Sequence, residues 1–143
     1  MMKRTLPIFL IIIFAATSVF AKGLENIEIF DINQGKVVKT AASSPVVQKE
    51  VKSYLEGITG IYGKINPIPD KGYMIKIPLE PPMRFESQWL NSLVEEVIIL
   101  FPEGQSPYLL VFDNENRALF FTFEGRTDKL LKNLHYKYNK NKE

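Results

Sequence analysis

The sequence contains no cysteine and only one histidine, His135, among its 143 residues. The missing thiols exclude thiol catalysis, zinc–thiolate centres, iron–sulfur ligation and disulfide bonds. A Ser–His–Asp triad would require His135 to lie beside Ser87, Ser92 or Ser106, and none of these serines has the setting of a nucleophile elbow. The sequence therefore favours a protein that is not an enzyme. A small hydrolase that uses a carboxylate or a serine together with His135 is the alternative.

Carboxylates are also not arranged in the patterns of catalytic or metal sites. Glu95 and Glu96 are adjacent, so on a strand they point to opposite faces and do not form the paired acids of a glycosidase. The run Asp113–Asn116 offers four side-chain oxygens, whereas a calcium site needs six to eight converging ones. A turn explains this run, and we expect no metal and no cofactor.

The first 21 residues have the pattern of a secretory signal peptide. Lys3 and Arg4 form a short basic start, and an apolar run follows over Leu6–Phe20. Small or branched residues at the −3 and −1 positions predict cleavage between Ala21 and Lys22. The run is short for a membrane-spanning helix, which needs about 20 apolar residues. The alternative is an uncleaved single-pass membrane anchor, which would make the domain an extracytoplasmic sensor or assembly factor.

An exported protein without cysteine must rely on packing alone, which is more typical of a bacterial envelope than of a eukaryotic secretory route. We therefore expect this protein to be secreted or to lie in the cell envelope, outside the cytoplasmic membrane. A cleaved chain would be long enough to bury a core without cross-links.

The charge is distributed unevenly along the chain that would remain after cleavage. Lys22–Gly125 carries ten basic and fourteen acidic residues, whereas Arg126–Glu143 carries six basic and two acidic ones. We predict a single domain over 22–135 and a basic polar tail over 136–143. We expect the partner to be an envelope protein or, through the tail, an anionic wall or membrane polymer, and not a nucleic acid. The sequence does not indicate an oligomeric state.

Several stretches have the pattern of β-strands. Two apolar runs flank the polar residues Asp113–Asn116, which predicts a hairpin over 108–123 that is covered on both faces. Tyr73–Leu79 alternates, and the prolines in and after it predict a strand that lies at an edge or ends there. Glu86–Phe101 fits a helix or a strand. We favour a strand over Leu93–Phe101, because it would pair with the hairpin.

Two stretches have helical patterns. Ser44 and Pro45 predict a helix start, and apolar residues at helical spacing continue the helix over about 45–57, with Gln48 on the polar side. A second helix is predicted over about 128–135. The sequence thus predicts an α+β domain with a mostly antiparallel sheet of about five to six strands around a central hairpin at 108–123, covered by these two helices.

Besides the basic tail, aromatic side chains point to a binding surface. The chain has ten Phe, six Tyr and one Trp, and those near predicted loops or strand ends could line a groove. The candidate residues are Tyr62, Tyr73, Phe85, Trp89 and Tyr108. With the signal pattern and the thin catalytic inventory, they favour a small exported bacterial protein that acts as a binding or interaction module.

Overall fold

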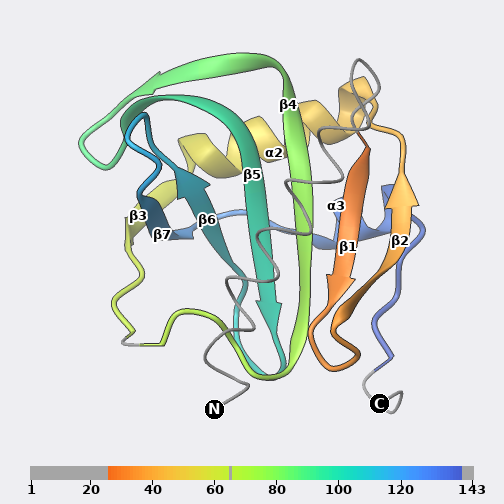
Figure 1. Ribbon diagram of the computed structural model, residues 1–143. Coiled ribbons are helices and arrows are strands. Elements are labelled where there is room, and N and C mark those ends of the chain that lie inside the picture. Colours follow the sequence, from red (N-terminus) through yellow and green to blue (C-terminus); the bar gives the residue numbers. More distant parts are fainter. Residues whose placement is uncertain (1–25, 65, 140–143) are drawn as a thin grey trace.

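The computed structural model describes residues 26–64 and 66–139 (Figure 1). The predicted signal peptide, its cleavage site and the end of the predicted tail lie outside the described residues. The elements are β1 (Ile27–Asp31), β2 (Lys36–Ala41), α2 (Pro45–Glu56), β3 (Ile58–Ile61), β4 (Gly72–Glu86), β5 (Asn91–Pro102), β6 (Tyr108–Phe112), β7 (Ala118–Phe123) and α3 (Asp128–Asn133).

The strands form one sheet of seven, in the order β2-β1-β4-β5-β6-β7-β3, with every neighbouring pair antiparallel. The predicted α+β class is confirmed, with slightly more strands than expected. The strand that the sequence analysis missed is β3, which pairs with β7 across about 60 residues of chain. Its short run of alternating residues after Gly57 has no local signal that separates it from the end of the helix.

The predicted hairpin is confirmed as β6 and β7, joined by a turn in which Asp113 accepts hydrogen bonds from the backbone N–H groups of Glu115 and Arg117. Leu109 and Leu110 of β6, which point to opposite faces, are both buried, whereas in β7 only Phe121 is buried. The predicted cover on both faces therefore holds for β6 and not for β7. The middle strand of the sheet is β5, whereas this hairpin lies nearer the β3 edge. The strand favoured over Leu93–Phe101 is confirmed as part of β5.

Strand β4 continues to Glu86 despite Pro78, Pro81 and Pro82. The expectation of an edge strand was wrong, because β4 lies between β1 and β5. Its pairing with β1 covers only residues 73–76, however, and its register with β5 shifts beyond Pro78. The prolines therefore lie where β4 extends past β1, so no ladder on that side requires their missing N–H groups.

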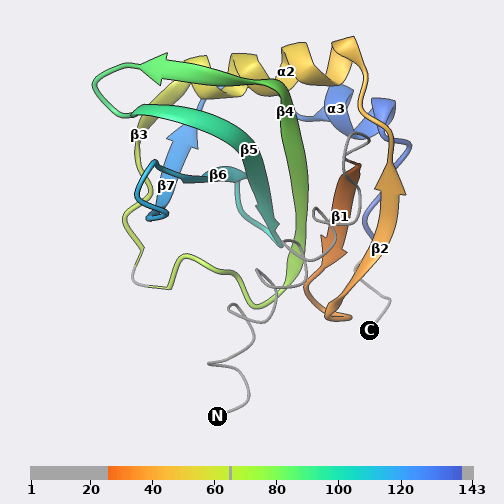
Figure 2. The same ribbon diagram turned by 45° about the horizontal axis from the view of Figure 1, so that its top comes forward.

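Both helices are confirmed and lie on the same side of the sheet (Figure 2). Ser44 caps α2 by accepting a hydrogen bond from the Val47 backbone N–H at 3.2 Å, and Pro45 occupies the first turn. The apolar stripe of α2 and the Leu130 side chain of α3 pack into one core cluster with one face of the strands. A second cluster lies on the opposite face, and none of its described members belongs to α2 or α3.

The described part of the predicted tail packs against the domain. Tyr136 and Tyr138 each place a ring 5.0 Å from the ring of Tyr73, which also stacks on Phe101 at 4.5 Å. The Tyr138 hydroxyl donates a hydrogen bond to Glu103 Oε2 at 2.6 Å. These contacts hold the end of the described chain beside the start of β4.

Candidate functional site

The strongest candidate site is the side of the sheet that faces away from α2 and α3, which we call the helix-free face. The strand registers place its side chains in two neighbouring rows that run across β1, β4, β5 and β6. The first row is Phe30, Met74, Leu100 and Tyr108, and the second is Glu28, Lys76, Ile98 and Leu110.

A buried cluster of charges interrupts the apolar rows. Lys76 Nζ lies 3.7 Å from Glu28 Oε1 and 3.9 Å from Glu96 Oε1. The side chains of Lys76 and Glu28 are each 2 % exposed, whereas that of Glu96 is 33 % exposed. Water screens the first pair little, so its attraction is strong, but removing both charges from water offsets much of the gain. A charged cluster of this kind contributes more to the specificity of binding than to the stability of the fold.

The β6 end of the helix-free face is closed by the loop that precedes β4. Tyr62 stacks on Tyr108 with ring centroids 3.7 Å apart and planes 8° apart. The Tyr108 hydroxyl donates a hydrogen bond to the Pro67 carbonyl. Burial raises the pKa of the Tyr108 hydroxyl above its ordinary value, and the electrostatic interaction and hydrogen bond with Tyr62 raise it further. These two rings therefore form an aromatic rim at the β6 end of the face, two strands from Lys76.

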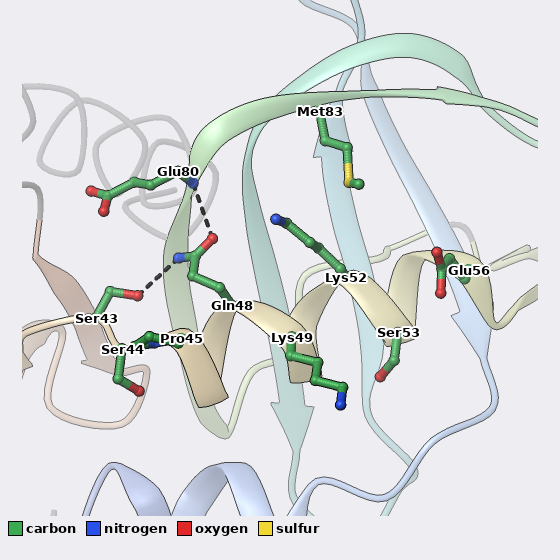
Figure 3. Close-up of a pocket in the computed structure, with 10 residues that line it drawn as sticks. All are labelled: Ser43, Ser44, Pro45, Gln48, Lys49, Lys52, Ser53, Glu56, Glu80 and Met83. Atoms are coloured by element: carbon green, nitrogen blue, oxygen red, sulfur yellow. Dashed lines mark hydrogen bonds between the residues drawn. The ribbon is translucent and has the colours of Figure 1, made fainter.

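A second candidate is a groove of about 670 Å³ between α2 and the bend of β4 (Figure 3). Gln48, expected on the polar side of the helix, is buried there. Its Nε2 donates to Ser43 Oγ and to the Pro78 carbonyl, both at 2.8 Å, and its Oε1 accepts from the Glu80 N–H at 3.0 Å. Lys52 points toward β4 and Lys49 points away from it (Figure 3).

The polar atoms that line this groove are the ones that connect α2 to β4 through hydrogen bonds. The amide of Gln48 satisfies the backbone of β4 just past the end of its pairing with β1, so its bonds serve the fold. We therefore assign Gln48 a structural role and place the candidate binding surface on the helix-free face.

The catalytic alternative receives no support from the position of His135. This residue follows α3 with a φ of 53° and is exposed, and its carbonyl accepts a hydrogen bond from Lys39 Nζ of β2. Ser87 and Ser92 lie instead around the turn between β4 and β5, across the sheet from β2 (Figure 1). Ser92 donates a hydrogen bond to Asn114 Oδ1 at 2.8 Å. Within 26–64 and 66–139, no group of three or more acidic or histidine side chains could hold a metal ion.

The structure separates the five aromatic residues that the sequence suggested. Tyr62 and Tyr108 lie together on the helix-free face. Tyr73 lies on the opposite face, and Phe85 and Trp89 pack partly buried near the turn between β4 and β5. The binding surface proposed from sequence is therefore not one continuous patch.

Sequence reasoning missed the charged cluster. Its signal was present in Tyr73–Leu79, where Lys76 is the single charged residue and shares a face with Met74. The partner Glu28 similarly alternates with isoleucines in β1. A lone lysine on the inward face of an apolar strand needs a nearby carboxylate, which the strand pattern alone does not locate.

The described part of the chain has no helix long and apolar enough to cross a membrane. Comparisons of the chain with protein-family models, with curated proteins and with solved structures give no match in any of the three.

Proposed function

We propose that this protein is an exported, non-enzymatic binding module that uses the helix-free face to hold an apolar segment of a partner protein. The observation that carries the proposal is the composition of that face: apolar rows on four strands that surround the Glu28–Lys76–Glu96 cluster, with both helices on the other side. Large apolar patches that are exposed to solvent are typical of interaction sites, and the proposal requires this face to become accessible to the partner.

The charged cluster supports a selective partner. Two carboxylates and one ammonium group leave a formal charge of −1 beside the apolar rows. A partner that packs against these charges with polar groups of complementary sign would bury them at a lower cost than a fully apolar or acidic partner would. The aromatic rim of Tyr62 and Tyr108 provides a rigid boundary on one side.

The proposal is tested by capture from an envelope fraction with a chain that begins at Lys22, in three forms. Leu100→Glu introduces a charge into the helix-free face, whereas Ile61→Glu introduces the same charge at a side chain that is 70 % exposed on the edge strand. We expect the same protein to be captured by the unmodified chain and by Ile61→Glu, and to be lost with Leu100→Glu.

Circular dichroism must first establish that Leu100→Glu retains its fold. If it does not, Met74→Gln makes a milder polar change on the same face. Capture of the same proteins with a folded Leu100→Glu or Met74→Gln chain as with the unmodified chain would refute the assignment of the face.

A further inference from the structure

The two edges of the sheet differ in how they are protected from pairing with another strand. An edge strand presents unpaired backbone N–H and C=O groups, and lysine side chains or a covering segment commonly block it. Edge strand β2 carries Lys36 and Lys39, and Lys39 Nζ donates a hydrogen bond to the His135 carbonyl at 3.1 Å. The chain that follows α3 runs beside this strand (Figure 1).

The opposite edge strand, β3, lacks such lysines. Its sequence is Ile-Thr-Gly-Ile, without charge or proline, and within the described residues its one neighbouring strand is β7. The Ile61 side chain is 70 % exposed, the largest exposed fraction among the large apolar side chains of the described chain. An uncharged edge with an exposed isoleucine is a place where another strand can add to the sheet.

The hydrogen bonds to β7 indicate which backbone groups of β3 are directed outward. Ile61 pairs with Phe121, and the next N–H, that of Tyr62, donates to the Phe120 carbonyl at 2.8 Å. Because successive residues of a strand direct their N–H and C=O groups to opposite sides, those of Ile61 point away from β7. The register shift near the start of β3 confines regular pairing to this end of the strand. An added strand would therefore be centred on Ile61.

We propose that β3 pairs antiparallel with β3 of a second copy of this chain, around a two-fold axis beside Ile61. The two-fold axis sets Ile61 opposite itself and opposes no like charges. Lys64 then lies opposite Ile58 of the second copy, two residues after Glu56, which ends α2. Lys64 and Glu56 are both exposed, so the pairing brings opposite charges together at each end of the contact.

The difference between the two edges favours a closed dimer. Addition of β3 to β2 would repeat from copy to copy into a filament, and the lysines of β2 oppose it. Two-fold pairing instead joins two sheets of seven strands at their unprotected edges and leaves only the two β2 edges outside. One short strand from each copy buries less than about 1,200 Å², the range of weak complexes, so the dimer should dissociate on dilution.

The absence of cysteine from the chain allows the register to be tested by disulfide cross-linking. Directly opposite residues of an antiparallel pair have Cβ atoms about 4.5–5.5 Å apart, close to the separation in a disulfide. Ile61→Cys should therefore cross-link two copies under mild oxidation. Lys64→Cys should not, because this register separates its two copies by about 20 Å. Thr40→Cys, exposed on β2, is the control for the other edge. Each variant is made in the full chain and in the chain that begins at Lys22, with the same result expected in both.

Charge replacement at Ile61 tests the two-fold axis without a cross-link. Ile61→Glu and Ile61→Lys each set like charges opposite one another, so each should raise the Kd of the dimer, measured by sedimentation, at least tenfold. A 1:1 mixture of the two variants sets opposite charges together and should restore the dimer. Because Ile61 is largely exposed, neither change should disturb the fold, which circular dichroism checks.

Three results would overturn the proposal. They are cross-linking of Lys64→Cys or Thr40→Cys as readily as of Ile61→Cys, a mixture of the two charged variants that stays monomeric, and an unmodified chain that is still monomeric at about 1 mM, where weak complexes form. The last result is also expected if this edge accepts only an extended segment of another protein. Neither measurement uses a partner or the helix-free face, so the dimer and the proposed binding module can fail separately.

Discussion

Replacement of Gln48 by leucine is expected to destabilise the fold by removing the side chain that connects α2 to the bend of β4. The amide of Gln48 donates to the Pro78 carbonyl and accepts from the Glu80 N–H, and thereby takes the place of β1, whose pairing with β4 ends at Lys76. Leucine has a similar volume but offers neither a donor nor an acceptor. The change therefore removes hydrogen bonds while leaving most of the packing.

The expected magnitude follows from which groups lose their partner. The bond to the Pro78 carbonyl is buried, and an unsatisfied buried polar group costs about 1–3 kcal/mol. The Glu80 N–H and Ser43 Oγ are closer to solvent and can bond to water, so they add about 0.5 kcal/mol. We expect a total loss of about 1.5–3.5 kcal/mol, which for a domain of this size lowers Tm by about 6–14 °C.

The measurement is urea unfolding of the Lys22–Glu143 chain followed by the fluorescence of Trp89, the only tryptophan. Lys49→Leu is the matched control, because Lys49 is exposed on the next position of the same helix and should change stability by less than about 0.5 kcal/mol.

Gln48→Glu gives a second readout, since only a protonated carboxyl can donate to the Pro78 carbonyl. Burial beside this carbonyl raises the folded-state pKa of the introduced carboxyl, so its stability deficit should be present at pH 7 and shrink as the pH falls toward about 4. A Gln48→Leu chain as stable as Lys49→Leu would refute the reasoning.

Three further predictions concern the sheet. Gly72→Ala should destabilise by about 3 kcal/mol in urea unfolding, because φ is +130° and the added Cβ would lie 2.1 Å from the Phe101 carbonyl oxygen; a loss below 1 kcal/mol would contradict this. Lys76→Met in the full chain should cost about 3 kcal/mol by removing the ammonium group beside the buried Glu28 carboxylate, and adding Glu28→Met should restore part of it. Burial raises the pKa of the Tyr73 hydroxyl above its ordinary value. The contribution of Tyr73 to the free energy of unfolding should therefore be complete below pH 10 and be lost as the pH rises further. Absorbance at 295 nm should show tyrosinate forming together with unfolding, and tyrosinate that forms well before unfolding would contradict the raised pKa of Tyr73.

Local patterns predicted the elements whose signals lie within one stretch of sequence. The helix at 45–57 has a cap, a first-turn proline and an apolar stripe close together, and the hairpin at 108–123 has two apolar runs around turn residues. Both appear where expected. Strand β3 could not be predicted in this way, because Ile58–Ile61 becomes a strand only by pairing with β7.

The candidate site was less predictable, because its geometry arises from register. Glu28 and Lys76 are 48 positions apart in the sequence, and they meet only because β1 and β4 pair with these two residues directly opposite. Helical periodicity likewise placed Gln48 on the polar side of α2. It could not anticipate that β4 bends over that side and buries the amide.

The consecutive buried residues of β4 and β5 require cover on both faces of the sheet, and α2 and α3 supply it on one of them. Residues Tyr73–Ile77 are buried at consecutive positions, so both faces of the sheet must be covered. The two helices cover the face of Ile75, while Met74 and Lys76 point to the other. A sheet that is apolar on both faces but has helices on one must obtain its second cover from another segment or another molecule. The proposed function supplies this cover from a partner protein, which we expect to dock on the row of Phe30, Met74, Leu100 and Tyr108.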